Sequence, residues 1–280
     1  MSADVRGERR TFADLGPRIV SSLVLGVVAI AVLWVGGVTF ALFWLAAALA
    51  ILWEWQALIG TAGQRPRFLV GAVGTAIATA FASYIALEIA GLVLLLAALL
   101  VGVVAEHRHR LMAAAGVLYA GALVAAIIAL RFSDSFGLVA VAWLFAIVWG
   151  TDVMAYFGGR LIGGPKLWPR VSAGKTWSGT IVGIVCGGLV GLAVALIAIG
   201  GAPSLPLLLL GLLLAAVSQG GDLAESALKR RFGVKDSGAL IPGHGGVMDR
   251  LDGFTAACVC ATFIGALRHY PFIAAGLFSW

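Results

Sequence analysis

The sequence consists mainly of apolar stretches about 17–25 residues long, which is the length of helix that crosses the hydrocarbon core of a bilayer. Charged residues make up only 11% of the 280 residues, and the mean hydropathy is +1.05, whereas a soluble domain carries about 25% charged residues. So much apolar surface can be buried only with the help of lipid, which predicts an all-α polytopic integral membrane protein with about nine transmembrane helices. The expected spans lie near residues 18–35, 38–60, 68–86, 88–105, 111–130, 136–157, 177–200, 203–219 and 253–275.

Lysines and arginines are distributed unevenly between the two sides that nine spans define. All but two of the 19 basic residues, Arg131 and Arg268, fall in the N-terminal tail or in every second connection. Cytoplasmic segments carry such an excess, so we expect the N-terminus in the cytoplasm and the C-terminus outside, in the cell inner (plasma) membrane. A miscount of one span would remove the asymmetry, which therefore supports the number nine. The formal charge of +6 is then explained by the basic residues that orient the chain in the membrane. These residues can also attract anionic lipid. No nucleic acid partner is expected.

The expected organisation of the chain has three parts. A cytoplasmic tail at residues 1–17 precedes about five N-terminal transmembrane helices in residues 18–135. A catalytic transmembrane region then occupies residues 136–280, with two long cytoplasmic loops at 158–176 and 220–252. These two loops carry the most unusual polar residues of the chain, and they are where we expect function.

The second loop is a charged island between apolar spans. Residues 220–253 hold five of the 13 acidic residues of the chain. Two pairs of acids are three positions apart, so each pair shares a face if it lies on a helix, and carboxylates brought together repel unless a cation holds them. A magnesium ion commonly takes one or two carboxylates plus substrate phosphates and waters. Any single charge could equally be solvated or ion-paired, but the whole set lies against apolar spans and predicts a site where cations meet phosphates. The five acids are Asp222, Glu225, Asp236, Asp249 and Asp252.

Bases and a glycine-rich turn accompany these acids. Lys229 and Arg230 are placed to meet phosphate charge, and an arginine can grip two oxygens at once. His244 lies in the turn Pro242-Gly243-His244-Gly245-Gly246, where glycines allow close approach of the backbone to a ligand. His244 could donate a hydrogen bond to a phosphate or to a base, and a structural turn histidine is an equal alternative.

The first loop carries a second group of candidates. Asp152 lies at the cytoplasmic end of the sixth span, where a buried acid is either functional or the partner of a nearby base. Residues 172–176 are similar to the end of a phosphate-binding P-loop, but Pro169 stands where the pattern needs glycine and no strand is expected before it. Exposed N–H groups, hydroxyls and Lys175 can still hold a phosphate at a helix N-terminus, and a helix cap with an interfacial lysine is the alternative.

Two further features of the spans are less specific. Glycines at positions 179, 183, 187 and 191 share one helix face and predict close helix packing rather than a site. Glu54 lies near the cytoplasmic end of the second span, where it either supports the site or extends to the interface. The residues themselves do not decide between these two roles.

Three segments together resemble the signature of the phosphatidate cytidylyltransferase family, also called CDP-diacylglycerol synthases. They are residues 226–230 (SALKR), 235–238 (KDSG) and 244–252 (HGGVMDRLD). Residues 152–176 and the Glu54-Trp55 pair are also similar to the family. Ala173 and Ser178 depart from its usual pattern around the Lys-Thr pair, which concerns the detailed role of the first loop.

The resemblance implies that CTP and phosphatidic acid react to give CDP-diacylglycerol and pyrophosphate, with Mg²⁺ as cofactor and K⁺ as a second candidate cation. Lipid phosphate would attack the α-phosphorus of CTP, and cations would offset the charge of both anionic reactants. Membrane lipid is expected as a partner in addition to the two substrates, and a homodimer is left open. The candidate metal ligands are Asp222, Asp236, Asp249 and Asp252, with Lys229 beside them as a catalytic residue. The candidate substrate-binding residues are Asp152, Ser172, Lys175, Thr176, Ser226, Arg230, Lys235, His244, Gly245, Gly246 and Arg250.

Two alternative functions remain at this stage. A CTP-dependent lipid-alcohol kinase would need a base for its alcohol and would transfer the γ-phosphoryl group. A cation-coupled transporter would place its acids deep within opposed spans. The acids here cluster in loops at one face, and no inverted repeat is visible, which disfavours the transporter.

Overall fold

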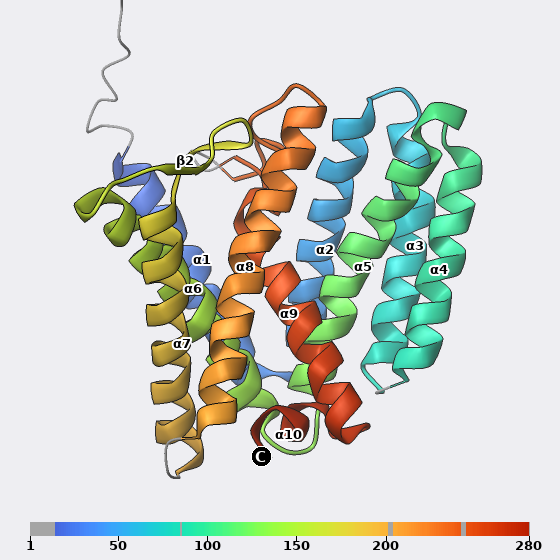
Figure 1. Ribbon diagram of the computed structural model, residues 1–280. Coiled ribbons are helices and arrows are strands. Elements are labelled where there is room, and N and C mark those ends of the chain that lie inside the picture. Colours follow the sequence, from blue (N-terminus) through green and yellow to red (C-terminus); the bar gives the residue numbers. More distant parts are fainter. Residues whose placement is uncertain (1–14, 85, 201–203, 242–244, 280) are drawn as a thin grey trace, which may run out of the picture.

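The computed structural model describes residues 15–84, 86–200, 204–241 and 245–279 of the chain, and most of these residues are helical (Figure 1). Within these described ranges, seven helices, α2 and α4 to α9, are long and apolar enough to cross a bilayer. The all-α polytopic fold is thereby confirmed, while the exact number of spans and the sidedness of the termini stay predictions. The helices are α1 (Leu15–Val35), α2 (Gly37–Ile59), α3 (Gln64–Ala82), α4 (Leu87–Val104), α5 (Arg110–Arg131), α6 (Gly137–Leu161), α7 (Trp177–Ile199), α8 (Leu205–Arg231), α9 (Met248–His269) and α10 (Ile273–Phe278), with a 3-10 turn η2 (His107–His109) before α5 and two strands, β1 (Lys166–Trp168) and β2 (Ser172–Thr176), between α6 and α7.

Two boundaries differ from the sequence-based expectation in a way that matters for function. Helix α8 continues to Arg231 and α9 begins at Met248, so the connection between them is far shorter than the expected loop at 220–252. The sequence-based prediction ended the eighth span, and began the ninth, where the charged residues of 220–252 occur. Within the structure these charges pair between α8 and α9, so the helices continue through them.

The first loop also contains regular structure that the sequence did not predict. Strands β1 and β2 form an antiparallel hairpin in which Lys166 pairs with Thr176 and Trp168 with Ser172. A strand therefore does precede the Lys175-Thr176 pair, contrary to expectation. Thr176 is the N-cap of α7, and its hydroxyl accepts a hydrogen bond from Gly179 N (3.1 Å), so the helix-cap alternative for this segment is present in the structure.

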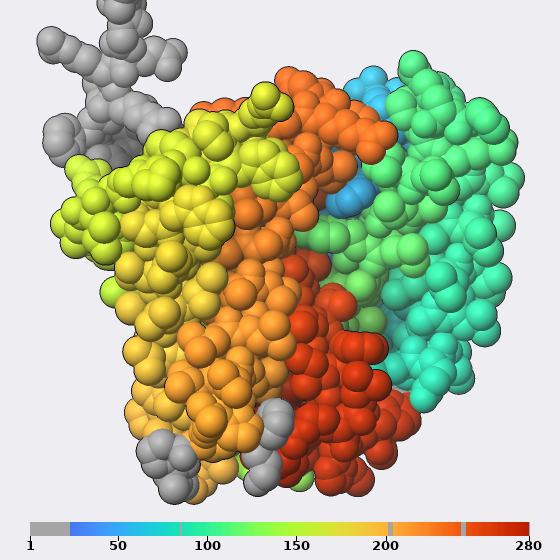
Figure 2. All heavy atoms as spheres, in the orientation of Figure 1, coloured from blue at the N-terminus to red at the C-terminus, as the bar shows by residue number. Residues whose placement is uncertain are grey.

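The hairpin and the connection between α8 and α9 lie at the same end of the helix bundle, and α10 lies at the other end (Figure 1). This arrangement agrees with the expected topology, which places both segments on one side of the membrane. With all atoms drawn, the second half of the chain, from yellow to red, covers the left and centre of the visible face, and α3, α4 and α5, in teal and green, cover the right (Figure 2). Only small blue areas from the start of the chain remain in view between them.

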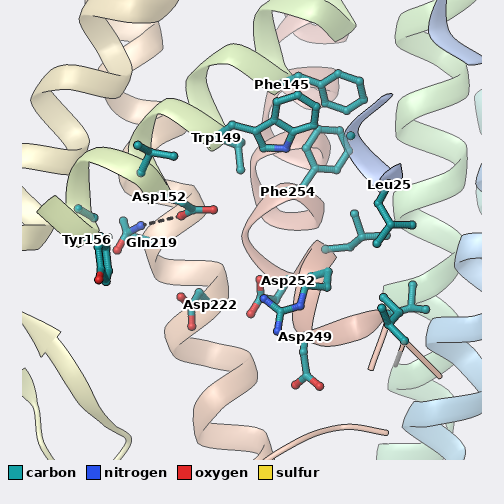
Figure 3. Close-up of a pocket in the computed structure, with 18 of the residues that line it drawn as sticks. Leu25, Phe145, Trp149, Asp152, Tyr156, Gln219, Asp222, Asp249, Asp252 and Phe254 are labelled. Atoms are coloured by element: carbon teal, nitrogen blue, oxygen red, sulfur yellow. Dashed lines mark hydrogen bonds between the residues drawn. The ribbon is translucent and has the colours of Figure 1, made fainter. Parts of the chain in front are cut away.

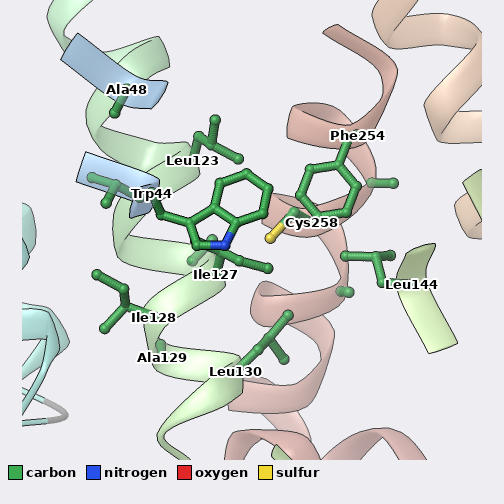
Figure 4. Packing of buried hydrophobic residues seen from close by; sticks show 14 of the residues in the cluster. Trp44, Ala48, Leu123, Ile127, Ile128, Ala129, Leu130, Leu144, Phe254 and Cys258 are labelled. Carbon is green, nitrogen blue, oxygen red and sulfur yellow. The ribbon is translucent and has the colours of Figure 1, made fainter. Parts of the chain in front are cut away.

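The core lies where α2, α5, α6 and α9 meet. The indole ring of Trp44 stacks on the phenyl ring of Phe254, with 5.3 Å between ring centroids, and Leu123, Ile127 and Cys258 are fully buried beside them (Figure 4). This packing ties α9, from the end of the chain, to α2, from its beginning. The first turn of α9 is consequently held at a fixed place relative to α2.

Helices α6 and α7 pack closely through glycines, as the spacing of four predicts. Gly179, Gly183, Gly187 and Gly191 are all buried. A Cβ atom at Gly183 would meet Thr151 O at 2.7 Å, and one at Gly187 would overlap Thr151 Oγ1. Only glycine lets the two backbones approach this closely, and the close approach fixes β2 and Lys175 relative to α6.

The Gly187→Ala variant should therefore lower the melting temperature, because the added methyl forces α6 and α7 apart. Overpacking of this kind typically costs about 1–3 kcal/mol. Gly91→Ala is the matched control, because a Cβ atom on that helical glycine would meet nothing within 4 Å. Thermal unfolding of the two purified variants in detergent provides the measurement. Equal melting temperatures for both would show that the α6–α7 contact is not tight.

Candidate active site

A cavity of about 1480 Å³ lies between α1, α2, α6, α7, α8 and α9, next to the hairpin. Helices α1 and α2, from the first part of the chain, line this cavity together with α6 to α9. One end is polar and contains Asp152, Asp222, Asp249 and Asp252 (Figure 3). The cavity thus joins charged groups and apolar groups in one space.

The apolar end is formed by aromatic side chains from three helices. Phe145 and Trp149 of α6 stack in parallel with 5.0 Å between centroids, and Phe254 of α9 lies 5.2 Å from Phe145. Trp44 of α2 continues this cluster, and Leu25 contributes from α1 (Figure 3). These side chains offer hydrocarbon contact but no charge, so this end suits acyl chains.

A chain of polar contacts crosses the polar end of the cavity from α6 to α8. Gln219 Nε2 donates to Asp152 Oδ1 (3.3 Å), and Gln219 Oε1 accepts from Lys175 Nζ (3.1 Å). Lys175 Nζ also forms an ion pair with Asp222 Oδ2 (2.7 Å), whose other oxygen accepts from Ser226 (3.3 Å). The Lys175 ammonium is therefore fixed at the cavity wall, where it can meet an anion.

Lys229 lies between two carboxylates. Its Nζ is 2.6 Å from Glu225 Oε2, one turn earlier on α8, and 2.6 Å from Asp249 Oδ1 on α9. All three side chains are nearly buried, with 12%, 3% and 7% of their surface exposed. The lysine therefore links α8 to α9 and compensates charges that would otherwise repel in a site with little water.

Asp249 is saturated with hydrogen-bond donors. Besides Lys229, its carboxylate accepts from Ser237 N (3.0 Å), Ser237 Oγ (3.0 Å) and Gly246 N (2.8 Å). These donors come from the connection between α8 and α9. Asp249 consequently organises that connection and has little capacity left for a further ligand.

Asp252 has a different environment, although it lies only three residues further along α9. Its Oδ1 accepts from Gly253 N (2.6 Å), and none of the ion pairs between described residues involves it. Asp222 and Asp152 lie near enough for their charges to repel that of Asp252. Three acids from three helices thus face one cavity with Lys175 as the base paired to one of them (Figure 3).

Known proteins with similar sequences identify the family of the chain. The chain matches the family described as "Cytidylyltransferase family" over residues 16–267. The chain belongs to the cytidylyltransferase family. A protein of Brucella abortus (strain 2308) named "Phosphatidate cytidylyltransferase" is 43% identical over 272 residues, which are 95% of this chain and 98% of the relative. A protein of the same name from Bacillus subtilis (strain 168) is 42% identical over 140 residues, which are 50% of this chain and 52% of the relative. Another of that name, from Staphylococcus epidermidis (strain ATCC 35984), is 48% identical over 118 residues, which are 42% of this chain and 45% of the relative. The resemblance noted in the sequence is confirmed.

The residues of this cytidylyltransferase fit a magnesium ion only in part. Among the described residues, no three His, Cys, Asp or Glu side chains are arranged as a metal site. Asp249 is already saturated by donors, and Asp236 is an exposed residue of the connection. Asp222 and Asp252 are the pair that fits, because Mg²⁺ needs only one or two carboxylates when substrate phosphates and waters complete its shell.

The other expected site residues of the cytidylyltransferase divide into two groups. Thr176, Asp236 and Arg250 line the cavity with the residues described above. The remaining described candidates do not: Ser226 supports Asp222, Arg230 Nε donates to Val171 O (3.4 Å), and Gly246 N supports Asp249. Ser172, Lys235 and Gly245 do not line the cavity either, and His244 is outside the described residues.

Sequence reasoning missed several cavity residues of the cytidylyltransferase. Gln219 joins Lys175 to Asp152, and Arg160 donates to the Tyr156 hydroxyl (3.1 Å) at the cavity wall. A signal for Gln219 did exist, because it precedes Asp222 by three positions and so shares a helix face with it. The assignment of Tyr156 and Arg160 needed the three-dimensional arrangement, since both lie in an ordinary aromatic segment at a helix end.

Proposed function

We propose that the chain is a phosphatidate cytidylyltransferase, which converts CTP and phosphatidic acid to CDP-diacylglycerol and pyrophosphate. One observation carries the proposal beyond family membership: a single cavity has carboxylates and lysines at one end and an aromatic apolar wall at the other. Phosphatidic acid has the same division into a phosphate and acyl chains. The relatives' shared name supports the same substrates.

The chemistry needs positioned charge rather than a general base. An oxygen of the lipid phosphate attacks the α-phosphorus of CTP, the bond from that phosphorus to the oxygen bridging to the β-phosphate breaks, and pyrophosphate leaves. Lys175 and Arg250 line the cavity, where their positive charges would draw the two anions together and stabilise charge in the transition state. The lipid phosphate is already anionic at neutral pH, so no side chain has to remove a proton from it.

Asp222 and Asp252 would hold the magnesium ion that the family implies. Bound there, the ion would supply positive charge to the phosphate oxygens of both reactants. The two carboxylates come from α8 and α9, whose relative position is set by the Lys229 bridge. The bridge therefore has an indirect function, since it keeps the two acids at a fixed separation.

The proposal is tested with CTP labelled in either its α- or its γ-phosphate, phosphatidic acid and Mg²⁺. We expect the α-label in the extracted lipid and the γ-label in released pyrophosphate. Transfer of the γ-label to a lipid alcohol would instead identify a lipid kinase and overturn the proposal. Cation flux into liposomes without CTP would identify a transporter.

We further propose that the polar end of the cavity faces the cytoplasm. Cysteines introduced in place of Arg170 and Leu240, both exposed, should react with an impermeant maleimide only from the cytoplasmic side, in a background without Cys186, Cys258 and Cys260. A cysteine in place of Tyr84, which is 86% exposed in the connection between α3 and α4, should react from outside. The opposite pattern would invert the topology. Ser237 is unsuitable for this test, because it is buried and hydrogen-bonded.

A further inference from the structure

Glu54 is a buried acid of α2 whose carboxylate is bound by residues almost two hundred positions later in the chain. It is only 2% exposed, so it does not extend to the membrane interface. Its Oε1 accepts from Val247 N (2.9 Å), and its Oε2 accepts from Met248 N (2.8 Å) and from Ser237 Oγ (3.1 Å). A side chain from the first half of the chain is thus part of the structure around the site.

Two of these donors belong to the start of α9. The first N–H groups of a helix have no partner within the helix, and the residue at the N-cap of α9, Val247, has no side-chain oxygen to supply one. A negative charge near a helix N-terminus is favourable. Glu54 therefore does for α9 what an N-cap side chain normally does, but from another helix.

The third donor is shared with Asp249. Ser237 Oγ lies 3.1 Å from Glu54 Oε2 and 3.0 Å from Asp249 Oδ2, and a hydroxyl has only one proton to donate. Ser237 N also donates to Asp249 (3.0 Å). Glu54 and Asp249 therefore contact the same residue, which connects Glu54 to Asp249 and to its partner Lys229.

Two glycines show how closely the connection is packed on Glu54. The three atoms nearest to a Cβ atom at Gly238 would all belong to Glu54, with Oε1 at 2.8 Å and Cδ and Cγ at 3.0 Å. A Cβ atom at Gly246 would meet Glu54 Oε2 at 2.6 Å and would overlap Ser237 Oγ. The backbone of this segment can approach the carboxylate only because both residues are glycine.

We propose that Glu54 is a positioning residue for cytidylyl transfer: it fixes Ser237, Val247 and Met248 on α2, so that Asp249, Lys229 and Asp252 keep their places at the cavity. The inference rests on the proposed function for its activity readout. Helix α2 also forms part of the apolar wall through Trp44 and Ala47. The same helix thereby sets the distance between the acyl end and the charged end of the cavity.

The Glu54→Gln variant tests the activity side of the proposal. An amide has one acceptor oxygen, so at least one of the three donors loses its partner. We expect kcat to fall about 10–100-fold, as for other residues that orient a site, while KM for phosphatidic acid stays within about twofold. Gln56→Leu is the control, because Gln56 is equally buried on α2 but bonds Arg67 and Ala113, away from the cavity. It should lower the melting temperature and leave kcat of the folded enzyme unchanged.

A double-mutant cycle tests the contact itself and does not depend on activity. Gly238→Ala alone should reduce hydrogen-exchange protection of the Ser237, Val247 and Met248 amides, because the methyl meets Glu54. In the Glu54→Ala background the same substitution should have almost no added effect, since the atoms it meets are gone. Additive effects, or unchanged kcat in Glu54→Gln, would overturn the proposal. A wild-type protein that makes no CDP-diacylglycerol would refute the proposed function, and the exchange cycle would still decide whether Glu54 holds this segment.

Discussion

The Asp252→Asn variant is expected to lose turnover by about 10²–10³-fold, the usual effect of removing one preorganised electrostatic group, while its melting temperature stays the same or rises. Asp252 faces Asp222 and Asp152 across the cavity and takes part in no ion pair between described residues. Its charge is therefore unfavourable beside these acids and becomes useful when a cation and phosphates bind. Asparagine keeps the size of the side chain and removes the charge.

The neighbouring acid should respond differently. Asp249→Asn weakens the contacts with Lys229, Ser237 and Gly246, so we expect both turnover and melting temperature to fall. Asp134→Asn, an exposed acid in the connection between α5 and α6, is the control and should change neither. The variants are compared by steady-state rates and by melting with and without Mg²⁺, which should stabilise the wild type more than Asp252→Asn. Normal turnover in Asp252→Asn would remove Asp252 from the site.

Replacing Lys229 by methionine should have the largest effect on stability. The substitution leaves Glu225 and Asp249 facing each other, with side chains only 3% and 7% exposed. Removing one partner of a buried ion pair typically costs about 3–5 kcal/mol. Loss of the bridge between α8 and α9 should also displace Asp222 relative to Asp252, so we expect turnover to fall below one thousandth of the wild-type rate if both the charge and the geometry are lost.

A second substitution separates these two effects. Glu225→Gln in the Lys229→Met background removes one of the two uncompensated charges, so the melting temperature should recover in part while turnover stays low. Melting curves and rates of the single and double variants give the comparison. A double variant that is no more stable than Lys229→Met would show that charge repulsion is not the cause of the instability.

The helices of the fold were largely predictable from the sequence because lipid imposes one simple requirement, a long apolar segment. The spans expected at 88–105 and 111–130 match α4 (Leu87–Val104) and α5 (Arg110–Arg131) closely. The ends of α8 and α9 were not predictable in this way. Their charged turns are stable as helix because Lys229 joins Glu225 to Asp249, a contact between segments that hydropathy treats separately.

The site was predictable in its composition but not in the role of each residue. Asp249 and Asp252 look equivalent in the sequence, three positions apart and both beside bases. In the structure, the Asp249 carboxylate accepts several hydrogen bonds from the connection between α8 and α9. The Asp252 carboxylate instead faces other acids across the cavity. Glu54 could not be assigned at all, because its partners lie in a segment that local pattern cannot place next to it.

The most direct test of the account is to locate the bound lipid with a phosphatidic acid that carries a photoactivatable diazirine in an acyl chain. The account predicts adducts at Leu25, Trp149 or Phe254, at the apolar end of the cavity, mapped by mass spectrometry and lost with excess unlabelled phosphatidic acid. Adducts confined to outward-facing positions of α4 such as Leu92 and Leu99, which are 57% and 67% exposed, and unchanged by that competitor, would contradict it.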